Sequence, residues 1–241
     1  MPSFTRSRDP KIFGNRLLDL MKPECRKMLA PHLRAIEVSV GQVICDAGAA
    51  VRDVYFPSTC VLSMLVLSRS GDGIETATIG REGAFGLIAG IQTNESYARC
   101  LVQMSGSAYR LPIEELKKVC DCNEPFRRVL ASYVQALFIQ VQQNVACNAL
   151  HPVEARLARW LLTMRDRAAA DVLPLTQEFL ASMLGVTRTT ETEAARELQA
   201  VGAIKYRRGT IAIVNPAELE AVSCECYEVV RIQFEKLLPE T

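Results

Sequence analysis

The stretch that decides the fold is LTQEFLASMLGVTRTT, residues 175–190. Thr176 is a favourable N-cap, and the apolar residues after it recur at the spacing of one helical face. Gly185 ends this helix, because glycine accepts a positive φ without a steric clash. Thr187 then caps a second helix. Two short helices joined by a tight glycine turn predict a helix-turn-helix, whose second helix enters the major groove of DNA.

A short hairpin with a basic tip follows, in the sequence AIKYRRGTIAI at residues 203–213. We expect it to form a wing that lies along the phosphates. The alternative is a helix pair and a hairpin that pack together only for stability. The predicted DNA contacts lie at the helix starts and on the wing: Thr176, Gln177, Thr187, Arg188, Thr189, Thr190, Thr192, Lys205, Arg207 and Arg208.

Within the second helix, Arg188 stands where a side chain reaches a base edge, and an arginine can bond guanine O6 and N7 with two hydrogen bonds. Glu193 could accept from a cytosine amine, but it would also repel phosphates. Glu191 falls on the inward face of the helix, and nothing in the sequence explains a carboxylate there.

Upstream, residues 36–111 have the pattern of many short strands separated by turn residues. Gly71-Asp72-Gly73, between two alternating runs, predicts a hairpin. Closely spaced strands of this kind favour an antiparallel sandwich or roll.

A long helix is predicted over residues 124–148, which contain no glycine and have their one proline, Pro125, in the first turn. One stripe recurs at steps of four and three: Leu130, Val134, Leu137, Val141 and Asn144. This spacing is typical of a two-stranded coiled coil and predicts a dimer helix. The alternative is that the same face packs on the roll of its own chain. His151-Pro152 then interrupts the helix and is the best hinge candidate, because the residue before a proline avoids the α region.

The composition bounds the function class. The chain has 241 residues, is 49% hydrophobic and has a net charge of +1, so it is neither disordered nor strongly basic. We expect a soluble cytoplasmic protein, because no apolar run has the length of a membrane span or a signal peptide. The chain has only two histidines and no phosphate loop, which argues against an enzyme.

The order of these parts resembles the Crp/Fnr transcription regulators over residues 15–240. The resemblance is carried by Gly41-Gln42, VYFP at 54–57, IGREGAFG at 79–86, RLARWLL at 156–162 and residues 175–188. It implies an α+β chain with an antiparallel β-roll of the cyclic-nucleotide-binding type. The implied parts are the N-terminal helices and roll at 1–122, a dimerisation helix at 123–150, and a winged helix-turn-helix domain with a C-terminal helix at 151–241. It also implies a homodimer that binds a two-fold related promoter site in double-stranded DNA, acts on RNA polymerase and touches no membrane.

The resemblance also defines an effector pocket, in which this sequence departs from the cyclic-nucleotide binders. Those proteins hold the ribose with a glutamate after the glycine and the phosphate with an arginine about ten residues later. Here Leu87 follows Gly86, and Arg99 is shifted by one or two positions. The pocket positions are Phe85, Gly86, Leu87, Ile88, Arg99, Val141 and Gln142. We expect an effector other than cyclic AMP, and a small-molecule receptor or a thiol redox sensor remains the alternative.

The nine cysteines are scattered, without a CxxC pair. Cys25 stands alone near the N-terminus, where an iron–sulfur regulator of this family has a cluster of cysteines. Cys224 and Cys226 are the redox candidates. If both lay on one helix, they would point about 200° apart and could not easily bind one metal. We therefore predict no metal and no cofactor.

Overall fold

The computed structural model describes residues 13–69, 71, 73–88 and 94–239. The N-terminal part begins with two short helices, α1 (Arg16–Asp19) and α2 (Pro23–Leu29). The described residues then form the strands β1 (Arg34–Val38), β2 (Val43–Cys45), β3 (Asp53–Pro57), β4 (Val61–Leu67), β5 (Gly73–Ile79), β6 (Arg99–Met104) and β7 (Gly106–Pro112). They form two antiparallel sheets, in the orders β1-β7-β3 and β2-β6-β4-β5. The predicted roll is confirmed. The turn residue Asp72 lies outside the described residues.

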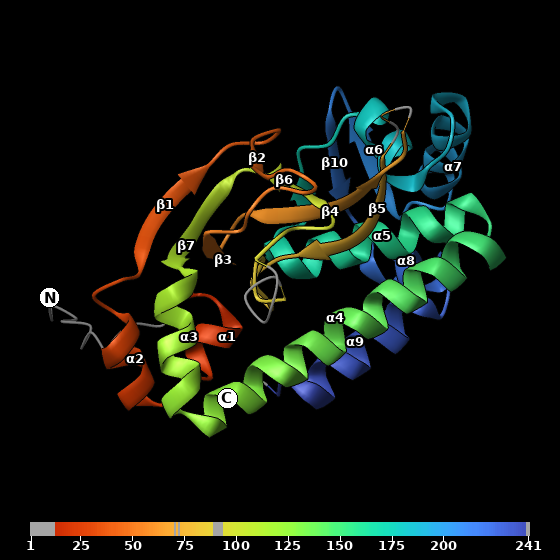
Figure 1. The fold of residues 1–241 in the computed structure, drawn as a ribbon. Helices are drawn as coiled ribbons and strands as arrows, with labels where there is room; N and C mark the ends of the chain where they lie inside the picture. Colours follow the sequence, from red (N-terminus) through yellow and green to blue (C-terminus); the bar gives the residue numbers. More distant parts are fainter. Residues whose placement is uncertain (1–12, 70, 72, 89–93, 240–241) are drawn as a thin grey trace, which may run out of the picture.

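The C-terminal part is helical apart from one small sheet (Figure 1). Its helices are α3 (Ile113–Cys122), α4 (Glu124–Leu150), α5 (Val153–Ala168), α6 (Gln177–Leu184), α7 (Arg188–Ala200), α8 (Pro216–Val222) and α9 (Cys226–Leu237). Its strands are β8 (Val172–Leu173), β9 (Ile204–Arg207) and β10 (Thr210–Ile213), which pair in the order β8-β10-β9. Among the described helices, none is both long and apolar enough to cross a membrane.

Strand β4 is buried on both faces, and this joins the two parts of the chain. Side chains alternate across a strand, so Leu62 packs into the core of the roll, whereas Val61 and Leu65 pack into the core of the C-terminal part. The near-continuous apolar run at 61–67 follows from this double burial.

A buried carboxylate lies at the same boundary. Glu75 on β5 accepts hydrogen bonds from the Trp160 indole of α5, at 2.8 Å, and from the Ser63 hydroxyl of β4, at 2.5 Å. Burial raises the pKa of Glu75, although both hydrogen bonds and two nearby arginines oppose the shift.

Two glycines of the 79–86 motif are explained by close packing. A Cβ on Gly83 would lie 2.4 Å from the Tyr133 ring, and a Cβ on Gly80 would lie 2.4 Å from the Arg167 Cβ. The loop therefore packs closely against both α4 and α5. Arg167 on α5 also forms an ion pair with Glu82 of the loop at 3.2 Å. The motif holds helices against the roll.

The long helix α4 is correctly predicted, with Asn123 as its N-cap and Pro125 in its first turn. It runs alongside α9 (Figure 1). The predicted dimer stripe needs correction, because it faces the core of its own chain. Leu137 and Asn144 are buried, and Leu130 and Val141 pack against the roll. The alternative interpretation, self-packing, describes this stripe better.

Asn144 shows why the stripe turns inward. Its side-chain amide donates to the Thr76 carbonyl at 2.9 Å and its oxygen accepts from Arg159 at 2.9 Å. This polar residue of the predicted dimer stripe instead joins α4 to the roll and to α5. Val134, the remaining residue of the stripe, is half-buried.

Candidate nucleic-acid interface

Helix α6 and the turn after it have the predicted caps. The Thr176 hydroxyl accepts from the Phe179 amide at 3.2 Å, and Gly185 ends the helix at φ 65°. The Val186 amide donates to the Ala181 carbonyl at 3.0 Å, which closes the turn. These bonds fix the angle at which the next helix leaves.

Helix α7 presents its N-terminal residues to solvent. Thr187 caps it, accepting from the Thr190 amide at 3.3 Å, and Arg188 and Thr189 are exposed beside it. The hydroxyls of Thr190 and Thr192 already have partners within the helix: Thr187 Oγ1 at 2.9 Å and the Arg188 carbonyl at 2.8 Å. Arg188 and Thr189 are thus the freest of the predicted contacts on this helix.

The basic hairpin is formed by β9 and β10, in the register Thr210 opposite Arg207. Its two-residue turn has a positive φ at both Arg208 (26°) and Gly209 (75°), as a tight type I′ turn requires. Lys205, Arg207 and Arg208 are all exposed.

A groove of about 380 Å³ lies between the wing and the helix pair, lined by Thr176, Gln177, Glu178, Arg188, Tyr206, Arg208 and Gly209. It brings together predicted residues from α6, α7 and the wing. Two residues that hold the wing in place were not predicted from the sequence. Tyr206 is half-buried in the groove, and the side-chain oxygen of Gln199 accepts a hydrogen bond from the Tyr206 amide at 3.1 Å. Alternation along β9 could have shown that Tyr206 faces opposite to its basic neighbours.

Glu191 is fully buried beneath α7, on the inward face that the periodicity predicts. One of its oxygens accepts from Thr192 at 3.4 Å, and the other has no hydrogen-bond partner. Burial raises the pKa of Glu191, partly opposed by the Thr192 hydrogen bond and the charge of Arg188.

The residues predicted for the effector pocket lie in different surroundings. Phe85 and Leu87 are buried in the core of the roll, and Gly86 has φ 97°, with its backbone close to the Asp53 carbonyl. Ile88 is exposed, and Arg99 pairs with Asp46 at 2.6 Å. Val141 packs on the core, whereas Gln142 lies on the exposed face of α4.

The two redox candidates, Cys224 and Cys226, do not lie on one helix. Cys224 is in the loop between α8 and α9, not on a helix with Cys226, and both are buried. The sulfur of Cys224 lies 3.5 Å from that of Cys147 on α4, which lowers the pKa of Cys147 and raises that of Cys224.

Comparison with known proteins identifies the C-terminal part. Residues 155–222 match the family model described as the Crp-like helix-turn-helix domain. This part of the chain is a Crp-like helix-turn-helix domain. The match includes α5, the helix pair and both strands of the wing.

Over about 80% of its length the chain shares its fold with solved structures of regulators, among them one of the CRP/FNR family. FixK2 from Bradyrhizobium japonicum is 17% identical, with a TM-score of 0.68, over 80% of this chain and 98% of that one. A transcriptional regulator of the CRP/FNR family from Thermus thermophilus is 20% identical, with a TM-score of 0.62, over 79% and 98%. The c-di-GMP responsive global regulator CLP from Xanthomonas campestris is 13% identical, with a TM-score of 0.65, over 80% and 100%. No curated protein matches the sequence significantly.

Proposed function

We propose that this protein is a cytoplasmic, sequence-specific transcription regulator that binds promoter DNA as a homodimer. The observation that carries the proposal is the shared exposed face of α7 and the wing. Arg188 stands at the start of the recognition helix, Arg208 of the wing lines the same groove, and Arg207 is exposed beside it. The recognition helix can contact base edges in the major groove while the wing contacts phosphates of the DNA backbone.

The dimer forms, in this proposal, through the exposed face of α4. Its exposed residues recur at steps of three and four: Ala131, Gln135, Phe138, Gln142 and Val145. Phe138 is 61% exposed and Val145 is 67% exposed, and the two lie seven residues apart on this one stripe. A second copy of α4 would bury both in a coiled-coil seam.

A dimer of this kind predicts the form of the operator. Two recognition helices related by a two-fold axis read two half-sites whose centres are separated by a whole number of helical turns, each about 10–10.5 base pairs. Selection of bound sequences from random double-stranded DNA should therefore return an inverted repeat. Recovery of a single unrepeated site, or of no enriched sequence, would contradict the proposal.

The bound dimer would act on transcription by recruiting or blocking RNA polymerase. We propose that the roll either senses an effector other than cyclic AMP or serves as a structural platform. This is supported by Leu87, which stands where the resemblance expects a ribose-binding glutamate, and by Arg99, which pairs with Asp46. Calorimetry with cyclic AMP and cyclic GMP should show no saturable binding, and low-micromolar binding of either would contradict it.

A further inference from the structure

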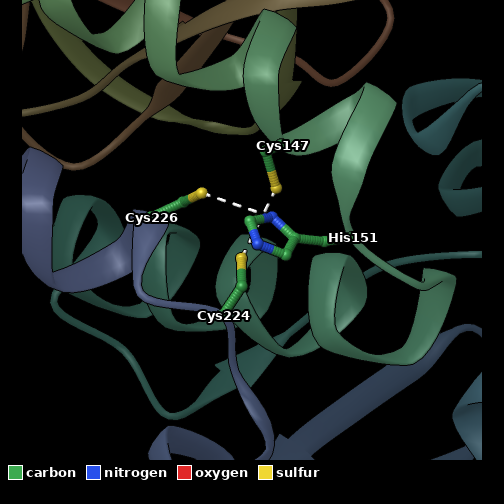
Figure 2. Close-up of side chains that lie close together, drawn as sticks. All are labelled: Cys147, His151, Cys224 and Cys226. Carbon is green, nitrogen blue, oxygen red and sulfur yellow. Dashed lines mark hydrogen bonds between the residues drawn. The ribbon is translucent and has the colours of Figure 1, made fainter.

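Four potential metal ligands converge where the long helix ends (Figure 2). Cys147 is in the last turn of α4, and His151 is the residue that caps it. Cys224 and Cys226 come from the junction of α8 and α9, more than seventy residues later in the chain. The three sulfurs and a ring nitrogen all lie within 4.8 Å of one another.

Two of the distances between these ligand atoms match those around a single tetrahedral ion. Zn–S bonds of about 2.3 Å and Zn–N bonds of about 2.0–2.1 Å place neighbouring ligand atoms about 3.3–3.8 Å apart. The Cys147 and Cys224 sulfurs are 3.5 Å apart, and the Cys226 sulfur is 3.5 Å from His151 Nδ1. An iron–sulfur cluster spreads four protein ligands over two or four iron atoms, so some of its ligand atoms lie further apart than the 4.8 Å found here.

The surrounding residues orient these ligands. Glu225 Oε1 lies 3.2 Å from His151 Nε2, so the imidazole can donate there and turn the lone pair of Nδ1 towards the sulfurs. The Gln143 amide donates to the Cys226 sulfur at 3.1 Å. A carboxylate behind a histidine and an N–H group on a thiolate are the outer contacts that metal sites of this type have.

The charges nearby give an independent indication. Arg156 and Arg159 are each 8% exposed and interact electrostatically with the Cys147 sulfur. Their hydrogen bonds go to neutral oxygens, on Leu184 and Asn144, and within the described chain neither forms an ion pair with a carboxylate. Three thiolates around a divalent cation carry a net charge of −1. Such a site would place one negative charge beside the two buried guanidinium groups, of which Arg159 also interacts with the buried Glu75 carboxylate.

We propose that Cys147, His151, Cys224 and Cys226 bind one zinc ion as a closed structural site. Three thiolates and one imidazole are a ligand set typical of structural zinc. The ion would tie the end of α4 to the α8–α9 junction, across the turn at His151-Pro152. If the proposed function holds, the ion also fixes the direction in which the DNA-binding domain leaves the dimer helix.

The test is to measure metal content and ligand type in the untagged full-length chain. Elemental analysis of protein purified under reducing conditions from zinc-containing medium should give one zinc per chain. Replacement by Co²⁺ should give the intense visible bands of a tetrahedral ion and a thiolate-to-cobalt charge-transfer band. Neither measurement needs a variant or DNA, so both stay valid if the proposed operator binding fails.

Variants then assign the ligands. Cys224→Ser and Cys226→Ser should each lose most of the zinc and weaken or shift the cobalt bands, whereas the exposed Cys122→Ser should match the parent chain. A parent chain that takes up neither zinc nor cobalt would overturn the proposal. So would full metal content in both ligand variants, or a Cys147–Cys224 disulfide found by mass spectrometry in the reduced preparation.

Discussion

Arg188 and Arg208 face the same groove, but the structure gives them different kinds of contact with DNA. Arg188 is in the first turn of α7, where a recognition helix meets base edges. Arg208 is at the turn of the wing, where a side chain reaches phosphate oxygens that carry no sequence information. The two residues should therefore separate specificity from general affinity.

We expect Arg188→Ala to relax specificity. Losing a two-bond contact with guanine costs about 1–3 kcal/mol against the preferred base, at one position in each half-site. Fluorescence anisotropy on the selected operator and on operators changed at single positions measures this. Arg34→Ala, an exposed arginine on β1, is the matched control. Equal weakening on every sequence would show that Arg188 contacts phosphate.

At the wing, Arg208→Asn is a better test than alanine, because asparagine tolerates the positive φ of this turn. Binding to all sequences should weaken alike. The slope of log K against log salt concentration should flatten by about 0.9 for each phosphate that the variant no longer neutralises. A changed base preference with an unchanged slope would contradict the assignment of the wing.

Glu191 should make the stability of the fold depend on pH. Its pKa is raised by burial, so the protonated form is favoured in the folded chain. The full contribution to stability is present below the ordinary pKa and is lost as pH rises through the raised pKa. We expect Glu191→Met to unfold at a higher temperature than the parent at neutral pH, by about 2–4 °C for each kcal/mol gained. The difference should disappear in acid, and a constant difference across pH would contradict the argument.

At the scale of elements, the sequence predicts helices and strands better than it predicts the faces they bury. The roll of short strands and both helices of the DNA-binding pair were predicted, because turn residues and caps mark the ends of such elements locally. For α4 the chain has two stripes with the spacing of a coiled coil. The stripe with Leu137 packs into the core of its own chain, and the stripe with Phe138 is exposed; the spacing alone does not distinguish the two.

The exposed stripe of α4 gives a test of the dimer. Phe138→Glu places a charge in the proposed seam. The variant should have the mass of a monomer in light scattering and should still be folded. Tyr97→Glu, at an 85% exposed aromatic residue on the roll, should leave the dimer intact. The neighbouring Leu137→Glu should unfold the chain instead, because Leu137 is buried. A Phe138→Glu chain of unchanged mass would place the interface elsewhere.

The zinc ligands were missed because a helix boundary was misplaced. On one continuous helix Cys224 and Cys226 would diverge, but Ser223 ends α8 and α9 begins only at Cys226. Cys147 and His151 carried a usable signal, because residues four apart on a helix share one face. Their contact with the later pair is a long-range contact that no local pattern contains.

At the scale of the whole molecule, the roll and the DNA-binding domain are joined rather than loosely linked. One apolar core contains Val61 and Leu65 of β4 together with helices of the C-terminal domain. Buried polar contacts cross the same boundary, with Arg167 on α5 pairing with Glu82 of the roll. This contact could not be predicted, since it depends on how two separately predictable units dock. A signal at the roll would reach the DNA-binding helices through this boundary.

The hydrogen bond from the Trp160 indole to Glu75 allows the strength of that boundary to be measured. Glu75→Ala leaves a buried N–H without an acceptor, which costs about 1–3 kcal/mol. Trp160→Phe removes the donor and leaves the carboxylate with Ser63. In a double-mutant cycle the two changes should be non-additive by about 0.5–3 kcal/mol in the free energy of unfolding, because the residues share one contact.

Limited proteolysis adds a readout specific to docking. If the contact holds the two domains together, Glu75→Ala should increase cleavage near His151-Pro152, whereas Glu75→Gln, whose carbonyl still accepts from the indole, should cleave like the parent. Denaturant unfolding of the four chains of the cycle gives the coupling energy independently. Additive effects, with unchanged cleavage in Glu75→Ala, would show that the domains dock without this hydrogen bond. The buried ion pair between Arg167 and Glu82 would then be the stronger candidate for the contact that holds the two domains together.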